Sequence, residues 1–446
     1  MRPLISWSDL RGAPVGLWGL GVEGSASLRR LQSMDTTPVL VDDDPAAPQR
    51  DGLDVLATGQ GGLRALLGCE VVIKSPGISR YRSEVGQLEK AGIPVRGGLG
   101  LWLEDADLER VACITGTKGK STTTALAGHL LNGLGHRTGV GGNIGHPPWD
   151  PSIGPEPDYW VIETSSYQVP DLTRAPPVVA VTSLSYDHLD WHGSMERYVA
   201  DKLSLCTKPG VQLVIADGSD DLLRDHAGLL GPEVQWVGPE DVKASDSWIR
   251  ALGLPGQHNV RNAALARAVL LALGIDGAND GVRLAEAAAG FTGLPSRCHS
   301  LGSVNGVEFV DDSLSTNVLP AQAALDAYAD RRVALLVGGH DRGLDYAPLG
   351  RTVADRRQPT LVVTMPDNGP RIGEAVRAAA GSETGAAVEV IDADDLEGAV
   401  TAAFRWSAPG GVVLLSPAAP SFGRFADYRD RARAFADAAA RCGPFD

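Results

Sequence analysis

The chain has few cysteines, no long apolar run and a shortage of basic residues. Its five cysteines (Cys69, Cys113, Cys206, Cys298 and Cys442) are scattered without a CxxC pair. This spacing indicates neither a disulfide framework nor a zinc knuckle, and it fits a reducing compartment. No run of about 18 apolar residues occurs, so we expect no membrane-spanning segment. The first residues, MRPLISWSDLRGAP, lack the apolar core of a signal peptide. We therefore expect a cytoplasmic protein.

The balance of charge excludes a further class. The chain has 40 Lys and Arg against 55 Asp and Glu, a formal net charge of −15. Because a general nucleic-acid binder depends on clustered Lys and Arg, we expect no nucleic-acid partner. The composition, 43% hydrophobic and 21% charged, is typical of globular proteins. A length of 446 residues predicts two or three domains.

Three segments of the chain each alternate strands with helices. The first has a strand, a glycine turn and a helix within 14–32, and strands at 38–44 and 71–79. The second opens at Val111 and has strands at 159–166, 178–185 and 211–218 and a helix at 257–274. The third has strands at 306–313, 332–339, 360–365 and 411–417. This alternation predicts an α/β protein with parallel, doubly wound sheets in three domains, at 1–104, 105–294 and 295–446.

The motif 116-GTKGKST-122 lies between an apolar run and a helix. Small residues there let backbone N–H groups surround an anion, Lys120 can reach phosphate oxygens, and the Ser121 hydroxyl can bind Mg²⁺. The full phosphate-loop formula also requires a glycine where this chain has Ile114. A plain strand–turn–helix connection is the alternative. Gly-Lys-Ser-Thr directly after a buried strand favours a site for nucleotide phosphates.

A second glycine turn, 19-GLGVEG-24, fits the GxGxxG pattern through Gly19, Gly21 and Gly24. Asp42, about 20 residues further on, could bind a ribose hydroxyl. A simple tight turn between a strand and a helix remains the alternative. The motif therefore predicts a phosphate or nucleotide site without identifying the ligand.

Two side chains follow predicted strands of the second segment, Glu163 in 163-ETSSYQ-168 and His188 in 187-DHLDWH-192. In a doubly wound sheet the carboxyl ends of the strands surround the ligand crevice. Glu163 and His188 could complete the coordination of Mg²⁺, although histidine is an unusual ligand for this ion. A capping or surface histidine remains the alternative for His188.

Five other polar residues have weaker patterns. Lys202 lies on an amphipathic helix, where a solvated lysine is the default. Asn259 and Asn262 are spaced i,i+3 on one helical face and could bracket a base. Arg297 and Asp312 could approach a nucleotide from the third domain. Spacing alone assigns none of the five a role.

Together these motifs resemble the Mur ligase family, the ATP-dependent amino-acid-adding enzymes of peptidoglycan precursor synthesis. The short GTxGKST loop is itself typical of that family, which accounts for the missing glycine. Within it, GLGVEG and 75-SPGIS-79 favour the glutamate-adding members that act on UDP-N-acetylmuramoyl-L-alanine. The matching stretches, in family order, are GTKGKSTTT (116–124), GGNIG (141–145), ETSSYQ (163–168), DHLDWH (187–192), YVADKLSL (198–205), HNVRNA (258–263), GLPSR (293–297), DDSLSTN (311–317) and LLSPAAPSF (414–422).

The resemblance implies a role for each candidate residue. A Rossmann-like first domain would bind the UDP substrate through Gly19, Gly21, Asp42, Ser75 and Gly77, with Asn143 at the muramoyl-alanine part. A central ATPase-like domain would bind ATP through Gly116, Thr117, Lys118, Gly119, Lys120, Ser121 and Thr122, with Asn259, Asn262, Arg297 and Asp312 also facing the nucleotide. A Rossmann-like C-terminal domain would bind glutamate through Thr316, Arg342, Ser416 and Phe422. Ser121 and Glu163 would hold one Mg²⁺ and His188 a second, bridged by Lys202 as a carbamate; Lys120, Lys202 and His188 would be the catalytic residues.

The implied reaction joins the UDP-sugar to glutamate and consumes ATP. The alanyl carboxylate attacks the γ-phosphate of ATP, and the glutamate amine then displaces phosphate from the acyl phosphate. The implied cofactors are ATP, two Mg²⁺ ions and the carbamylated Lys202. We expect a monomer that closes its domains around the ligands.

Three positions depart from the commonest glutamate-adding pattern. Lys118 stands where asparagine is usual, Leu314 where lysine is usual, and Arg342 where lysine usually meets glutamate. The altered pocket, with ETSSYQ and LLSPAAPSF, resembles a smaller branch that adds L-glutamate and has an epimerase to correct the product. We therefore predict L-glutamate. D-glutamate ligation, a ligase similar to folylpolyglutamate synthase and a non-catalytic nucleotide switch are the alternatives.

Overall fold

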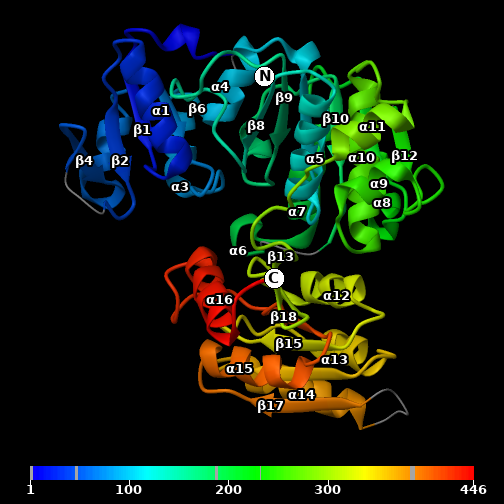
Figure 1. The fold of residues 1–446 in the computed structure, drawn as a ribbon. Coiled ribbons are helices and arrows are strands. Elements are labelled where there is room, and N and C mark those ends of the chain that lie inside the picture. Colours follow the sequence, from blue (N-terminus) through cyan, green and yellow to red (C-terminus); the bar gives the residue numbers. More distant parts are fainter. Residues whose placement is uncertain (1–3, 46–48, 186–188, 232, 382–386) are drawn as a thin grey trace. The chain divides into compact units, whose positions relative to one another are not determined.

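The computed structural model describes residues 4–45, 49–185, 189–231, 233–381 and 387–446, which form three six-stranded sheets (Figure 1). The chain divides into two compact units. Unit 1 comprises residues 1–252 and 260–291 and contains the first two sheets, and unit 2 comprises residues 253–259 and 292–446 and contains the third. The predicted α/β fold with mainly parallel sheets is confirmed.

The first sheet has the strand order β3-β4-β2-β1-β5-β6. All residues of its central strands β1 and β5 are buried, which is typical of parallel strands covered on both faces. Strand β3 pairs antiparallel with β4, and the other neighbours pair parallel. The elements are β1 (Val15–Trp18), α1 (Val22–Ser33), β2 (Val39–Asp42), β3 (Gln49–Arg50), β4 (Leu53–Ala57), α2 (Leu63–Leu66), β5 (Val71–Lys74), α3 (Ser83–Lys90), β6 (Val95–Arg96) and α4 (Gly98–Asp105), with short turns of helix η1 (Ser8–Leu10) and η2 (Thr58–Gly62).

The second sheet is parallel throughout its described pairings, in the order β12-β11-β10-β7-β9-β8. Helix α5 packs against β8 and β9 (Figure 1). The elements are η3 (Leu108–Arg110), β7 (Val111–Thr115), α5 (Lys120–Gly133), β8 (Thr138–Gly142), β9 (Tyr159–Glu163), η4 (Val169–Asp171), β10 (Val178–Val181), α6 (Leu189–His192), α7 (Met195–Leu203), η5 (Ser204–Thr207), β11 (Leu213–Asp217), α8 (Asp221–Asp225), η6 (Ala227–Leu229), β12 (Val234–Val237), α9 (Ser247–Leu252), α10 (Gln257–Ala272) and α11 (Gly281–Ala288).

The third sheet has the order β13-β14-β18-β15-β16-β17. Strand β13 pairs antiparallel with β14, and the remaining neighbours pair parallel. The elements are β13 (His299–Val304), β14 (Val307–Asp311), α12 (Val318–Ala327), β15 (Val333–Val337), α13 (Ala347–Ala354), β16 (Thr360–Thr364), α14 (Gly369–Ala380), β17 (Val388–Asp392), α15 (Leu396–Ser407), β18 (Val412–Leu415) and α16 (Tyr428–Cys442).

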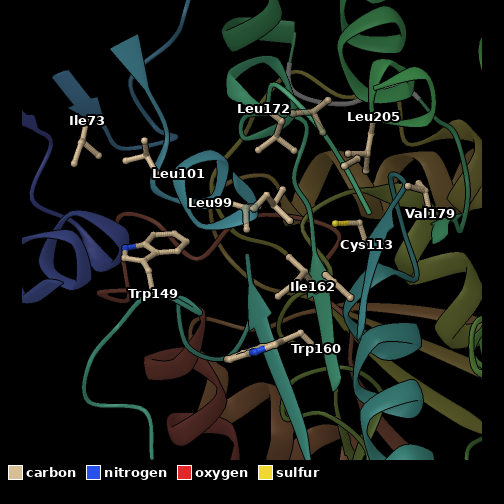
Figure 2. Packing of buried hydrophobic residues seen from close by; sticks show 14 of the residues in the cluster. Ile73, Leu99, Leu101, Cys113, Trp149, Trp160, Ile162, Leu172, Val179 and Leu205 are labelled. Carbon is tan, nitrogen blue, oxygen red and sulfur yellow. The ribbon is translucent and has the colours of Figure 1, made fainter. Parts of the chain in front are cut away.

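The two sheets of unit 1 share one hydrophobic cluster. Helix α4 contributes Leu99 and Leu101, strands β7 and β9 contribute Cys113 and Ile162, and strand β5 contributes Ile73 (Figure 2). Burial of apolar surface contributes a free energy of about 25 cal/mol per Å², and burial of this continuous surface is the main force that holds the two sheets of unit 1 together. Unit 2 has separate clusters on the two faces of its sheet.

A buried ion-pair cluster adds a polar connection within unit 1. The Asp171 carboxylate lies 2.6 Å from Lys74 Nζ and 2.6 Å from Arg80 Nη1. All three side chains are at most 6% exposed. Lys74 ends strand β5 and Asp171 ends η4, so the cluster joins the first sheet to the loop that follows strand β9. No helix among the described residues is both long and apolar enough to cross a membrane.

Candidate functional site

The phosphate loop occupies a turn that only glycine fits at two positions. Gly116 and Gly119 have φ of +138° and +87°, which L side chains rarely adopt. A Cβ on Gly116 would lie 2.2 Å from Thr182 Oγ1, and one on Gly119 would lie 2.5 Å from Asn262 Oδ1. The structure therefore brings Asn262 against the loop, from a helix far along the chain.

The lysines of the loop lie at the start of helix α5. Lys120 is the first residue of α5, and its Nζ donates a hydrogen bond to the Thr117 carbonyl (3.0 Å). Side chains of Thr182 and Ser183 hold the backbone of Lys118. Its N–H donates to Ser183 Oγ (2.9 Å), and its carbonyl accepts from Thr182 Oγ1 (2.6 Å) and from Ser183 Oγ (3.0 Å). The amino end of a 14-residue helix presents N–H groups and a positive dipole to the loop, which suits a phosphate.

Glu163 is a buried carboxylate with one oxygen unsatisfied. It ends strand β9 opposite Ile114 of β7, so it lies beside the strand that leads into the phosphate loop. Its Oε1 accepts a bond from Asn143 Nδ2 (2.8 Å), whereas its buried Oε2 has no hydrogen-bond partner among the described residues. A buried carboxylate oxygen without a partner is costly, and a bound cation would compensate it. Asn143, predicted to contact muramoyl-alanine, thus lies against Glu163.

Lys202 is buried at the phosphate loop, so the default of a solvated helical lysine does not hold. Its side chain is 2% exposed, and Nζ donates to the Gly116 carbonyl (2.8 Å). Nζ also lies 5.0 Å from the centre of the Tyr198 ring, whose hydroxyl shares a hydrogen bond with Thr117 Oγ1 (2.8 Å). The Lys202 side chain is therefore held against the backbone of the phosphate loop.

The predicted metal ligands are only partly described. His188 lies outside the described residues, so its role stays a prediction. Among the described residues, no three His, Cys, Asp or Glu side chains gather into a metal-binding group. Ser121, at 3% exposure on the first turn of α5, and Glu163 with its unsatisfied Oε2 fit a hard cation that prefers oxygen.

The predicted UDP-binding residues gather at the carboxyl ends of three adjacent strands. Gly19 follows β1, Asp42 ends β2 and Ser75 follows β5. The Leu20 N–H donates to Asp42 Oδ2 (2.7 Å), and Ser75 Oγ donates to the Gly19 carbonyl (2.7 Å). Gly19 has a φ of +90°, Gly21 precedes helix α1, and a Cβ on Gly77 would meet open space.

In unit 2 two predicted residues meet at the ends of neighbouring strands. Asp312 follows β14 and Ser416 follows β18. Asp312 accepts bonds from Ser416 Oγ (2.6 Å) and from the Cys298 N–H (3.1 Å), next to Arg297. Burial, partly offset by these bonds, raises the pKa of the Asp312 carboxyl to about 7. Asn259 belongs to unit 2, where its Nδ2 donates to the Pro255 carbonyl (2.7 Å).

The predicted glutamate-binding residues have different environments. Thr316 is partly buried, whereas Arg342 is exposed and Phe422 is 55% exposed. A cavity of about 180 Å³ lies beside Phe422 and is also lined by Arg424 and Arg431. The sequence analysis singled out neither of these two arginines. Arg424 follows closely after the matched LLSPAAPSF stretch, so its position in the sequence could have indicated it as a candidate.

Comparison with known proteins places this architecture in a family. Residues 114–270 match the model of the Mur ligase middle domain, and residues 296–419 match that of the Mur ligase, glutamate ligase domain. A protein from Xanthomonas euvesicatoria pv. vesicatoria is 42% identical, with 97% of this chain and 96% of that protein covered. A protein from a Micromonospora species is 39% identical, with 97% of each chain covered. Both carry the name UDP-N-acetylmuramoyl-L-alanine–L-glutamate ligase.

Solved structures agree with the fold. UDP-N-acetylmuramate-alanine ligase from Thermotoga maritima matches with a TM-score of 0.58 at 18% identity, covering 97% of this chain and 100% of that one. MurF ligase from the same organism, solved in complex with ADP, matches with a TM-score of 0.56 at 14% identity, covering 99% and 97%. With two family models and full-length relatives in agreement, the chain belongs to the Mur ligase family and is an enzyme of the ligase class.

Proposed function

We propose that the chain is an ATP-dependent ligase that adds L-glutamate to UDP-N-acetylmuramoyl-L-alanine in peptidoglycan precursor synthesis. The observation that carries this proposal is the identity of 39–42% to two relatives with that name, over 97% of this chain. The buried Lys202 and Glu163 beside the phosphate loop support a phosphoryl-transfer step. The proposal includes the predicted cytoplasmic location, the monomeric state and an epimerase that acts on the product.

The phosphate loop and helix α5 would hold the phosphates of ATP. Lys120 now donates to a carbonyl of its own loop, and on binding it would turn to the β- and γ-phosphates. Asn262 would hold the start of helix α5 beside the loop, because its Oδ1 accepts a hydrogen bond from Thr123 Oγ1 (3.3 Å). The proposal keeps Asn259, Arg297 and Asp312 as further nucleotide residues.

Ser121 and Glu163 would hold one Mg²⁺, and His188 with the Lys202 carbamate would hold a second. When bound, these ions would neutralise charge that spreads over the transferred phosphoryl group. The unsatisfied Glu163 Oε2 supports this assignment, because an ionised oxygen in that position favours a cation. Asn143 would orient Glu163 through its bond to Oε1.

The chain's own residues would position the reacting groups. The glycine turns of the first sheet, with Asp42, Ser75 and Gly77, would bind the UDP part and so direct the alanyl carboxylate to the γ-phosphate. Lys120 would stabilise the charge of that phosphate while the carboxylate oxygen attacks it. The glutamate amine would then attack the acyl carbon, and phosphate would leave with the former carboxylate oxygen.

The glutamate would bind in unit 2. Two carboxylates need two cationic or donor groups, and Arg342 offers a planar fork where a lysine is usual in the family. Arg424, which lines the 180 Å³ cavity beside Phe422, is an additional candidate. The proposal of L-glutamate rests on the relatives' names and on this altered pocket.

The decisive assay incubates the protein with UDP-N-acetylmuramoyl-L-alanine, ATP, Mg²⁺ and either enantiomer of glutamate. We expect phosphate release and a new UDP-dipeptide with L-glutamate. Turnover with D-glutamate alone would overturn the stereochemical part. Turnover with a folate and glutamate instead would favour the folylpolyglutamate alternative. ATP binding without any ligation would favour the nucleotide-switch alternative.

A substitution tests the carbamate. We expect Lys202→Ala to abolish ligation and to be partly rescued by small carboxylates in solution, because these can occupy the place of the carbamate. The matched control is Lys243→Ala, which removes an exposed lysine of the same unit and should leave turnover unchanged. Full activity of Lys202→Ala would contradict the assignment.

A further inference from the structure

Three side chains near the site form a chain of hydrogen bonds that the proposed mechanism does not use. His192 Nδ1 lies 2.7 Å from Asp201 Oδ2, and His192 Nε2 lies 3.0 Å from Ser166 Oγ. His192 is 1% exposed and Ser166 is 3% exposed. The order serine, histidine, aspartate is that of a nucleophilic triad. A nucleophilic hydroxyl, however, must be reachable by its substrate, and Ser166 is buried.

The partners of His192 indicate a different role. Ser166 follows Glu163 by three residues, in the loop after strand β9. Asp201 precedes Lys202 on helix α7. The His192 imidazole therefore bonds both to the loop that follows Glu163 and to the helix that carries Lys202. Together the two bonds restrain the position of the loop relative to the helix.

The ring of His192 also reaches the phosphate loop through a neighbour. It packs edge-on against Tyr198, with ring centres 5.3 Å apart. The Tyr198 hydroxyl shares a hydrogen bond with Thr117 Oγ1 (2.8 Å), and its ring lies under Lys202 Nζ. His192 thus contacts, directly or through one residue, the Glu163 loop, the Lys202 helix and the phosphate loop.

A fourth connection leads to the first sheet. Tyr81, in the segment after 75-SPGIS-79, donates its hydroxyl to Asp201 Oδ1 (2.6 Å), so Asp201 bridges Tyr81 and His192. The Tyr81 ring also packs edge-on against Trp191, with centres 5.9 Å apart. The segment proposed to bind the diphosphate of the UDP sugar is therefore bonded to the helix that carries Lys202.

We propose that His192 is a positioning residue that holds the Glu163 loop and the Lys202 helix in the arrangement that binds metal, and that Tyr81 couples this arrangement to occupancy of the UDP-substrate loop. The inference rests on the proposed function for the identity of the substrate. The bonds of Ser166 and Asp201 to one imidazole carry the first part, and the Tyr81–Asp201 bond carries the second.

The test measures metal affinity as well as turnover. His192→Phe keeps the ring packing and removes both hydrogen bonds, and Tyr81→Phe removes only the bond to Asp201. The matched controls are His136→Phe, where the ring packs on Tyr159, and Tyr428→Phe in unit 2. Each protein is titrated with Mn²⁺, detected by electron paramagnetic resonance, together with a non-hydrolysable ATP analogue, with and without UDP-N-acetylmuramoyl-L-alanine.

For His192→Phe we expect Mn²⁺ affinity and kcat to fall about 10- to 100-fold, the usual cost of losing a group that orients metal ligands. Its Kd for UDP-N-acetylmuramoyl-L-alanine, measured by calorimetry without metal or nucleotide, should match the wild type. For Tyr81→Phe we expect normal Mn²⁺ affinity without the UDP sugar and loss of the increase in affinity that the sugar produces in the wild type.

Several outcomes would overturn the inference. The first is that His192→Phe binds Mn²⁺ as tightly as His136→Phe does. The second is that the UDP sugar raises the Mn²⁺ affinity of Tyr81→Phe as much as that of the wild type. The third is that a fluorophosphonate labels Ser166, which would indicate a nucleophile. If His192→Phe does not fold, Ser166→Ala removes one bond alone, and its unchanged Mn²⁺ affinity would be equally contradictory. A wild type that binds Mn²⁺ but ligates neither glutamate would refute the proposed function, while the Mn²⁺ comparison would still decide the role of His192.

Discussion

Removal of Asp171 should strongly destabilise unit 1. Its carboxylate lies 2.6 Å from Lys74 Nζ and 2.6 Å from Arg80 Nη1, with its own side chain 2% exposed and that of Lys74 fully buried. In Asp171→Ala, Arg80 keeps its bond to Glu89. Among the described residues, the Lys74 ammonium keeps its hydrogen bond to the Ile78 carbonyl (2.9 Å) and the weaker electrostatic attraction of Glu23. A buried charge left without its partner costs about 3–5 kcal/mol.

Urea denaturation followed by tryptophan fluorescence measures the loss of unfolding free energy in unit 1. Eight of the nine tryptophans belong to unit 1, and only Trp406 belongs to unit 2. With a slope of about 3 kcal/mol/M, the upper value for small proteins, the loss corresponds to a midpoint lower by about 1–2 M. The matched control is Asp158→Ala, which breaks an exposed pair with Arg137 (3.2 Å) and should cost less than about 1 kcal/mol.

A double substitution tests the physical reason. In Lys74→Met/Asp171→Leu the buried charge pair is replaced by apolar side chains, so most of the stability should return, because such replacements are often neutral. A loss below about 1 kcal/mol in Asp171→Ala would refute the reasoning about uncompensated charge. The reasoning would also be refuted if the double variant lost as much unfolding free energy as its two single variants lose together.

Three further predictions concern the site. Glu163→Gln keeps an acceptor for Asn143 but removes the charge, so the Mg²⁺ concentration for half-maximal turnover should rise by about 10- to 100-fold or more; an unchanged Mg²⁺ titration would exclude Glu163 as a ligand. Gly119→Ala, at φ +87° and 2.5 Å from Asn262 Oδ1, should weaken binding of an ATP analogue in calorimetry, whereas Gly135→Ala, at φ +98° in open space, should not. Because burial raises the pKa of Asp312 to about 7, the folded unit 2 keeps a proton that the unfolded chain releases above about pH 4. Stability should therefore fall as pH rises from about 4 to 7, by up to about 1.4 kcal/mol per pH unit, and calorimetric melting of Asp312→Asn should lack this slope; equal slopes would contradict the shift.

Buried apolar runs made most of the fold predictable from the sequence. Strands such as β1, β10, β15 and β18 are buried along their whole length, so each appears in the sequence as a short apolar segment. Strand β8 was missed because its sequence, TGVGG, has almost no side chains to form a pattern. Gly139 has that identity because the Trp160 ring lies where its Cβ would be, 2.4 Å away, which is a tertiary constraint. The domain boundaries at 104/105 and 294/295 remain predictions.

The site could be predicted where its residues form a local motif. The phosphate loop is local, and the resemblance assigned Lys202 a role that spacing alone could not. Asn262 lies close to Gly119 although the two are far apart in the sequence. The bonds from His192 to Ser166 and Asp201 join residues of three separate motifs. Such contacts depend on how strands and helices pack, so no pattern in the chain indicates them.

The transfer of a carboxylate oxygen into phosphate tests the central claim most directly. The protein would be supplied with UDP-N-acetylmuramoyl-L-alanine labelled with ¹⁸O in the alanyl carboxylate, together with ATP, Mg²⁺ and L-glutamate, and the released phosphate analysed by mass spectrometry. The proposed acyl phosphate predicts one ¹⁸O atom in each phosphate released, because the bridging oxygen comes from the carboxylate. Phosphate released without the label, alongside an amide product, would contradict activation of the carboxylate by ATP at this site.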